Sequence, residues 1–259
     1  MLHSIAAPYA EPMFWLFPIA TALIAALSFA VFALPLTWLA ARDPEWARPY
    51  RLQSRPPRAQ QLVGASVKSW ALNNLLLLAS VIALWPVLRL SGIHAGPLPP
   101  WYAIAAQLVF FVYLDDFLFY WMHRTLHGQW LYKRIHGWHH RIVTPWAITG
   151  NYMHPLEYAL TGGCALIGPL LLGSHVVVVW AWFVFRQWEA AEGHCGYDFP
   201  WTPTHFLPFN DGAAHHDAHH AKVRGNYAGF LPLWDGIFGT YSRGYAEALD
   251  ARRAARGPA

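Results

Sequence analysis

Two long stretches of this chain carry no charged side chain. Residues 13–41 and residues 69–88 contain no Asp, Glu, Lys or Arg. Each is long enough to cross a bilayer, since a helix needs about 20 residues to span roughly 30 Å of hydrocarbon. Charged residues make up 12% of the 259 residues, whereas about a quarter is usual in a soluble domain. The sequence therefore predicts an all-α, integral-membrane helical bundle.

Two further apolar regions extend the predicted bundle. A third span covers residues 101–122. Residues 158–185 are also uncharged but contain several glycines, and the region is too short for two full spans and long for one. We expect a membrane hairpin over residues 156–188, because a single crossing would put His154 and His194 on opposite sides of the membrane.

Loop charges orient the predicted bundle. The loop between the first two spans carries six basic residues against two acidic ones, whereas residues 91–100 carry no charge. The basic residues are Arg42, Arg48, Arg51, Arg55, Arg58 and Lys68. The positive-inside bias makes this loop cytoplasmic, and the third span then returns the chain to the same side. We predict one membrane domain over residues 1–259, with a cytoplasmic, histidine-rich helical cap formed by residues 123–155 and 189–245.

Composition narrows the functional classes. The net charge is +4, but the basic residues lie in loops beside apolar segments, so we expect no nucleic-acid binding. The two cysteines, Cys164 and Cys195, form no C-x-x-C pair and predict neither a disulfide framework nor a thiolate zinc site. The Ala- and Arg-rich composition is compatible with a bacterial inner membrane, with the endoplasmic reticulum membrane as the alternative.

The histidines are concentrated on one predicted side of the membrane. Three of the fifteen, His3, His94 and His175, fall on predicted exterior loops or ends. The other twelve lie between His123 and His220 on the predicted cytoplasmic side. Because a metal site needs its ligands in one compartment, the charge bias and the histidine positions support each other.

Three histidine clusters have the spacing of metal ligands. His123 and His127 are four residues apart, and two H-x-x-H-H triplets follow. Positions i, i+3 and i+4 share one helical face, so each triplet can converge on one metal or on two adjacent metals. The triplets are His136, His139 and His140, and then His216, His219 and His220, the second preceded by His215. A single exposed histidine is more often an ordinary polar residue, but three clusters beside a membrane favour a metal site.

Eight imidazoles are too many for one ion of coordination number four to six, which indicates two metals. Imidazole binds iron, zinc, copper and nickel alike, so the ligand type does not fix the metal. Iron is the choice for redox chemistry, with zinc as a substitute.

Residues 116–127 and the two triplets resemble the three histidine boxes of the fatty acid hydroxylase/sterol desaturase superfamily in order and approximate spacing. Residues 193–200, 225–227 and 234–240 resemble the segments around the third box. The resemblance covers about residues 113–241. It implies a membrane enzyme with two iron ions that activates O₂, receives electrons from an external donor protein, and hydroxylates or desaturates a lipid.

The resemblance also implies which residues bind the metals, and it adds no catalytic residue beyond them. The implied ligands are His123, His127, His136, His139, His140, His216, His219 and His220, with His194 as a ninth. His154 and His215 are either ligands or supporting residues. Asp116 lies on nearly the same helix face as His123 and could accept an imidazole N–H. Asn151 and Glu157 flank His154, and either could support a ligand.

We expect the lipid to reach the metals through a cavity among the spans, lined by residues such as Phe110, Phe111, Tyr113, Phe117 and Trp121. Hydroxylation is favoured over desaturation because it needs only oxygen rebound after hydrogen removal. The less favoured alternatives are a zinc-dependent membrane hydrolase and a metal transporter. The clusters lie outside the predicted spans rather than along them, which disfavours a transport path.

Overall fold

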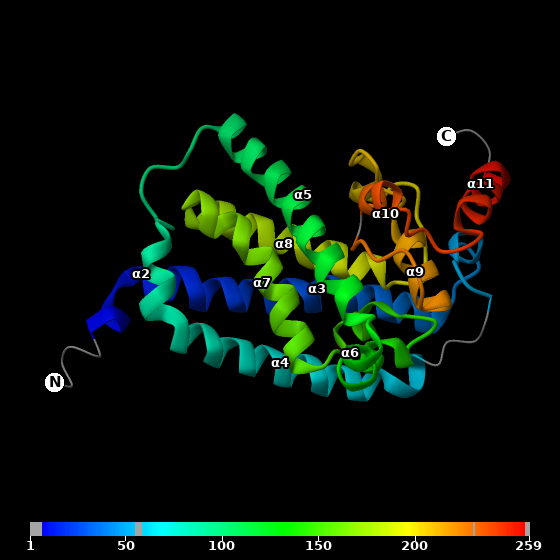
Figure 1. The fold of residues 1–259 in the computed structure, drawn as a ribbon, viewed down its shortest axis with the longest axis horizontal. Helices are drawn as coiled ribbons and strands as arrows, with labels where there is room; N and C mark the ends of the chain where they lie inside the picture. Colours follow the sequence, from blue (N-terminus) through cyan, green and yellow to red (C-terminus); the bar gives the residue numbers. More distant parts are fainter. Residues whose placement is uncertain (1–6, 55–58, 230, 257–259) are drawn as a thin grey trace.

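The computed structural model describes residues 7–54, 59–229 and 231–256 (Figure 1). Arg55 and Arg58 of the predicted basic loop lie outside these ranges. Among the described residues every regular element is a helix, and extended pairing is limited to two isolated bridges, Arg51 with Tyr197 and His94 with His175. The predicted all-α fold is confirmed.

Four helices are long and apolar enough to cross a membrane. They are Pro12–Arg42, which includes α2 (Pro12–Phe14), a π-helical turn (Trp15–Ile19) and α3 (Ala20–Arg42); Gln60–Ser91, which includes most of α4 (Ala59–Leu88); α5 (Trp101–Leu126); and α7 (Pro155–Leu172). Helix α4 begins at Ala59 rather than at residue 69, and α5 ends at Leu126 rather than at residue 122. Both helices therefore continue beyond the apolar stretches that predicted them.

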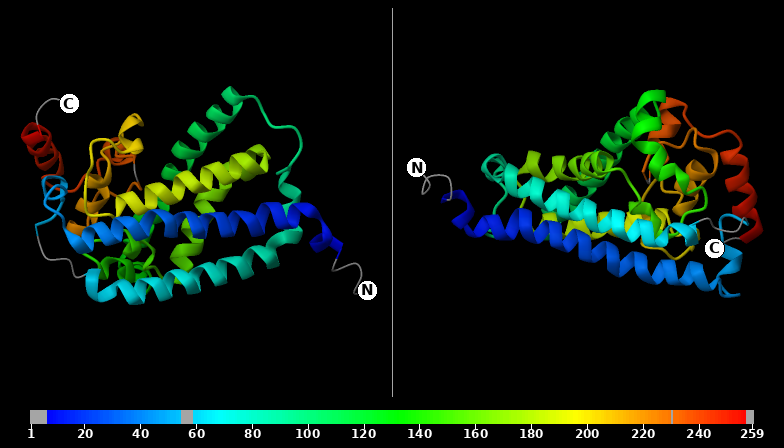
Figure 2. Two further views of the ribbon diagram at one scale, coloured as in Figure 1. Left: turned by 180° about the vertical axis from the view of Figure 1, so that it is seen from behind. Right: turned by 90° about the horizontal axis from the view of Figure 1, so that it is seen from below.

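The chain from α7 turns back through α8 (Val176–Gly193). Gly173 ends α7 in the left-handed conformation, with φ of +51°, at a point where an added Cβ would lie 3.2 Å from the Gly92 carbonyl oxygen. Helix α7 packs along α5, whereas α8 packs along α3 (Figures 1 and 2). The two arms therefore diverge from one another, but the start of α7 and the end of α8 both adjoin the histidine-rich region.

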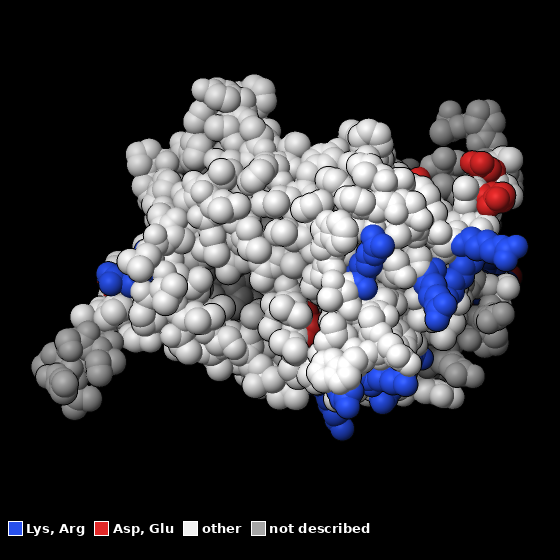
Figure 3. All heavy atoms as spheres, in the orientation of Figure 1, with Lys and Arg blue, Asp and Glu red and all other residues white. Residues whose placement is uncertain are grey.

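Short helices form the cap at one end of the bundle (Figure 1). They are α6 (Gln129–Arg134), 3-10 helices at His136–Arg141 and Ala147–Asn151, α9 (Ala213–Lys222), α10 (Leu233–Phe238) and α11 (Tyr245–Arg256). Lys and Arg gather on this end of the visible face, and a broad uncharged band separates them from a basic group near the opposite end (Figure 3). That distribution is the one expected of a membrane protein with a polar cap.

Candidate metal centre

Nine buried or half-buried histidines converge in the cap and form two adjoining groups. The five-histidine group contains His123, His127, His136, His140 and His219, and the four-histidine group contains His139, His194, His216 and His220. Within each group the candidate ligand nitrogens lie within 4.8 Å of one another. The structure thus brings together all nine residues that the sequence singled out as ligands.

Each H-x-x-H-H triplet supplies both groups. In the first triplet, His136 and His140 belong to the five-histidine group and His139 to the other. The second triplet lies on α9. Its middle member, His219, belongs to the five-histidine group, and its first and last members, His216 and His220, belong to the four-histidine group. The first triplet lies on a short 3-10 helix, where an α-helical face was expected.

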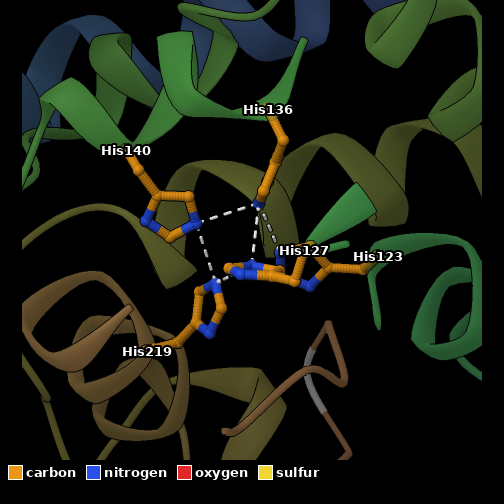
Figure 4. Close-up of side chains that lie close together, drawn as sticks. All are labelled: His123, His127, His136, His140 and His219. Carbon is orange, nitrogen blue, oxygen red and sulfur yellow. Dashed lines mark hydrogen bonds between the residues drawn. The ribbon is translucent and has the colours of Figure 1, made fainter. Parts of the chain in front are cut away.

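The Nε2 atoms of the five-histidine group face one another (Figure 4). His136 Nε2 lies 3.0 Å from His123 Nε2, 3.0 Å from His127 Nε2 and 2.9 Å from His140 Nε2. His219 Nε2 lies 3.0 Å from His140 Nε2 and 3.2 Å from His127 Nε2. Five imidazole nitrogens therefore surround one small volume.

The opposite ring nitrogens fix the tautomers. His123 Nδ1 donates to the Tyr227 carbonyl oxygen at 2.7 Å, and His136 Nδ1 donates to Glu157 Oε1 at 2.7 Å. A carbonyl oxygen and an ionised carboxylate both accept hydrogen bonds and cannot donate them. Each Nδ1 therefore carries the proton, and each Nε2 presents a lone pair. Two lone pairs 3.0 Å apart repel unless a cation lies between them, so this donor set fits a metal ion.

In the four-histidine group, backbone carbonyl oxygens likewise fix the tautomers of two members. His194 Nδ1 donates to the Ala190 carbonyl oxygen, and His220 Nδ1 donates to the Ile142 carbonyl oxygen, both at 2.8 Å. His194 Nε2 then faces His216 Nε2 at 2.9 Å and His139 Nε2 at 3.3 Å. These four nitrogens fit a second ion, bound only by imidazole.

Burial and neighbouring rings keep these imidazoles neutral. Burial, reinforced by His136, lowers the pKa of His127 to about 3, and burial lowers the pKa of His194 to about 4. Burial and neighbouring histidines also lower the pKa of five further ligands that lie outside the long helices: His139, His140, His216, His219 and His220. A neutral imidazole is the form that binds a metal, so the centre is ready to bind at neutral pH.

Glu157 is a carboxylate that supports a ligand histidine. It lies at the start of α7, is 3% exposed, and accepts the His136 N–H across 21 residues of sequence. Such a contact orients the ring and raises its basicity toward a metal. The sequence placed Glu157 near the site only through its position beside His154.

Asp116 and Asp235 hold the segment that follows the third box. Asp116 accepts backbone N–H groups from Gly229 at 2.8 Å and Leu231 at 3.2 Å. An added Cβ at Gly229 would lie 2.9 Å from Asp116 Oδ1, so the close approach requires glycine. Asp235 accepts the Tyr227 backbone N–H at 2.9 Å, which helps to aim the Tyr227 carbonyl at His123. Asp116 itself belongs to neither histidine group.

His154 and His215 also lie outside both groups. His154 caps the N-terminus of α7, where its Nδ1 accepts the Leu156 backbone N–H at 3.2 Å. His215 is fully buried, and its Nε2 lies 3.3 Å from Asp235 Oδ2. In the structure one is a helix cap and the other contacts a carboxylate that organises the cap.

A cavity adjoins both histidine groups. Four segments supply its histidines: α5 gives His123, the 3-10 helix gives His136 and His139, the end of α8 gives His194, and α9 gives His216. Its apolar wall includes Ala25, Leu77, Phe119, Ala165 and Phe183 from α3, α4, α5, α7 and α8. The polar side chains of Tyr158, Thr161 and Gln187 also line it. An apolar space that begins at the ligands and continues between the long helices suits a lipid chain or ring system.

The predicted lining of this cavity is wrong. None of the five aromatic residues expected there lines it, and the α5 residue that does is Phe119. Phe111 is buried against Trp182, Phe117 packs on Trp234, and Phe110 and Trp121 are exposed on the outer surface. The expectation relied on apolar character along α5 and did not identify the helix face that points inward.

These features together define a class: an all-helical membrane protein whose polar cap carries a histidine-rich centre. The fatty acid hydroxylase family model matches residues 108–240, and the chain belongs to that family. Methylsterol monooxygenase 2-2 of Arabidopsis thaliana is 43% identical over 169 residues, which are 64% of this chain and 63% of that protein. The very-long-chain aldehyde decarbonylase GL1-10 of Oryza sativa subsp. japonica is 34% identical over 222 residues, 84% of this chain and 73% of that protein.

The match spans 63% of the length of methylsterol monooxygenase 2-2 and 66% of the length of methylsterol monooxygenase 2-1 of Arabidopsis thaliana, which is less than two thirds of each protein. No solved structure matches the chain. The relatives named here are eukaryotic, so they do not support the bacterial inner membrane suggested by composition.

Proposed function

We propose that the chain is a membrane oxygenase in which the two histidine groups bind two iron ions and O₂ is used to hydroxylate a C–H bond of a lipid. One observation carries the proposal: both groups, with their Nε2 lone pairs converging, border a single cavity that continues between apolar helices. Two iron ions bound there would supply O₂ activation and hydrogen abstraction from an unactivated carbon.

The residues of the chain bind and orient the reactants. The carbonyl oxygens of Tyr227, Ala190 and Ile142 hold ligand rings in the tautomer that presents Nε2. The apolar side chains of Phe119 and Phe183 exclude water from the cavity and give a lipid carbon a place beside the histidines. An external redox protein supplies the electrons.

The names of the relatives suggest the substrate class. Methylsterols and very-long-chain aldehydes both combine a large apolar body with one oxygen-bearing group. The cavity has a matching character, with apolar walls and the polar side chains of Tyr158, Thr161 and Gln187. We therefore infer a lipid of this kind, either ring-based or long-chain.

Among the alternatives, desaturation would use the same centre. Hydroxylation is preferred because it needs only return of oxygen to the carbon that lost hydrogen, and because one named relative is a monooxygenase. A metal transporter has less support, since nine histidines gather at one end of the bundle instead of following a path through it. A zinc hydrolase has less support because one named relative is a monooxygenase. We also propose that the histidine-rich cap lies on the cytoplasmic side of the membrane, because the basic residues of the loop between the first two spans favour that side.

The test is metal content together with lipid-dependent O₂ uptake. Protein purified in detergent under reducing, anaerobic conditions is expected to hold about two iron ions per chain, as two adjoining ligand groups require. His139→Ala should lose about one of the two iron ions and the O₂ uptake, whereas the control His94→Ala, which changes an exposed histidine outside both groups, should lose neither. Failure to bind a redox metal after iron reconstitution, or full iron in His139→Ala, would contradict the proposal.

A further inference from the structure

One part of the cavity wall carries buried charge. Arg186 and Glu189, one turn apart on α8, both line the cavity and are 6% and 5% exposed. Arg186 Nη1 donates to Glu189 Oε2 at 2.7 Å, and Arg186 Nε donates to Asp115 Oδ2 on α5 at 2.7 Å. The guanidinium therefore bridges two carboxyl groups and fixes the direction of the Glu189 side chain.

Glu189 differs from the other carboxyl group on the cavity wall. Glu157 is bonded to His136 and so supports a ligand. Glu189 has no bond to a histidine; its hydrogen bond within the described residues is made by Oε2, to Arg186. Five residues after Glu189, just past the end of α8, the chain reaches His194, a member of the four-histidine group. Glu189 therefore carries a carboxyl group on the wall of the space in which the lipid and O₂ would react.

The surrounding charges favour a proton on one of the two carboxyl groups that Arg186 bridges, and of the two Glu189 is the one that lines the cavity. A buried carboxylate is stable only when it is paired and hydrogen-bonded. Asp115 and Glu189 share one guanidinium, while Asp116 on α5 is satisfied by backbone N–H groups and Glu192 on α8 by the Thr204 hydroxyl. With one cation between two acids, the arrangement has its smallest unpaired charge when one acid is neutral.

We propose that Glu189 is the proton donor of the cavity and that Arg186 is its positioning residue. This inference rests on the proposed function. Hydroxylation consumes one C–H bond, O₂, two electrons from the external redox protein and two protons, and yields an alcohol and water. Glu189 gives one of the two protons to the oxygen atom that leaves as water, and solvent supplies the second proton and restores the carboxylic acid after each turnover.

Glu189→Gln tests the role because glutamine keeps the size of the side chain and an oxygen for Arg186 but cannot release a proton. Proton transfer by a positioned side chain contributes roughly 10²- to 10⁴-fold to a rate. We expect iron content equal to wild type, product per O₂ consumed at least about tenfold lower, and the missing oxygen recovered as H₂O₂. The solvent deuterium isotope effect on product formation should also change, and Glu189→Asp, which keeps an acid, should recover part of the coupling.

The control is Glu45→Gln, an exposed carboxyl outside the cavity. If Glu189 serves only to stabilise the fold, Glu189→Gln will lower thermal stability but leave product per O₂ and the isotope effect unchanged, and the inference is overturned.

A readout that needs no turnover is the infrared carbonyl band of a protonated carboxyl group. Wild type should show this band at neutral pH, it should shift in D₂O, and Glu189→Gln should lack it. Absence of the band overturns the inference even in an active enzyme. A wild type that retains the band but has no lipid-dependent O₂ uptake overturns the proposed function, and the donor role with it, while the proton on Glu189 stands.

Discussion

The two histidine groups use the same side-chain chemistry in different surroundings. In the five-histidine group, His127 is half-buried, and the ring of His136 is held by the carboxylate of Glu157. In the four-histidine group all members are buried, and the N–H groups of His194 and His220 meet only backbone carbonyl oxygens. Nearness to solvent and a negative supporting group thus coincide in one group and are absent from the other.

This difference suggests that the two groups bind their ions with different affinity and have different roles in the reaction. A carboxylate behind a ligand raises its basicity, so the five-histidine group should hold its ion more tightly. The four-histidine group contributes three of its members, His139, His194 and His216, to the cavity wall, and it should lie nearer to the reacting carbon. Four predictions test whether the two groups differ in this way.

The largest effect should come from neighbouring residues on α9 that serve different groups. His220→Ala leaves three imidazoles in the four-histidine group, whereas His219→Ala leaves four in the other. Both variants should lose most activity, but His220→Ala should retain about one iron ion per chain and His219→Ala nearly two, because four ligands still suffice for an ion. Iron content at saturating iron measures the difference, and equal losses would show that the two groups act as a single site.

A second prediction concerns Glu157→Gln. The amide can still accept the His136 N–H, but the negative charge is lost, so affinity at the five-histidine group should fall roughly 10- to 100-fold. Competition with a chelator should reveal one weakened and one unchanged ion, with Glu45→Gln as the surface control. Weakening of both ions to the same extent would remove the proposed asymmetry.

Gly150→Ala should disturb the four-histidine group selectively. An added Cβ would lie 2.8 Å from the His194 ring, whereas an added Cβ at Gly163 would meet nothing within 4 Å. Gly150→Ala should therefore weaken iron binding about tenfold, as expected for a misplaced ligand, and Gly163→Ala should not. Chelator competition on the pair provides the measurement; identical behaviour would mean that His194 does not hold an ion.

Acid should affect both groups alike and produce the smallest effect. The folded pKa values of His127 and His194 lie below the ordinary 6.5, so the unfolded chain takes up protons first as pH falls. The stability of the metal-free protein should then be constant above about pH 6.5 and decline below it. Thermal unfolding between about pH 8 and pH 5 tests this, and a flat profile would contradict the lowered pKa values. Bound metal should delay the decline, since it competes with protons for Nε2.

The sequence was sufficient for the fold class and for the set of candidate ligands. Long uncharged stretches leave few alternatives to membrane helices, and clustered histidines in one predicted compartment identified eight of the nine members of the two groups, while the family resemblance added His194. Their division between groups was not predictable, because it depends on how the elements pack: the triplet on α9 is divided although it is α-helical, and the first triplet, in His136–Arg141, is a 3-10 helix. An α-helical reading places all three histidines of that segment on one face.

Contacts between residues far apart in the sequence could not be predicted either. Glu157 reaches His136 because α7 starts beside the cap, a relation that no local spacing reveals. Asp116 was considered as a partner for an imidazole, and the structure has it accepting backbone N–H groups from residues more than 100 positions away. In α5, hydrophobicity alone did not separate Phe119, which faces the cavity, from Phe111, which packs in the core.

Because the two triplets each supply both groups, metal binding at one group affects metal binding at the other. His139 and His140 are adjacent, yet they belong to different groups, and the same is true of His219 and His220. An ion that enters one group fixes the backbone that carries ligands for the other, so the conformational entropy of ordering both segments is largely paid at the first binding event. Iron loading should therefore be cooperative, with singly loaded chains scarce at intermediate iron concentrations.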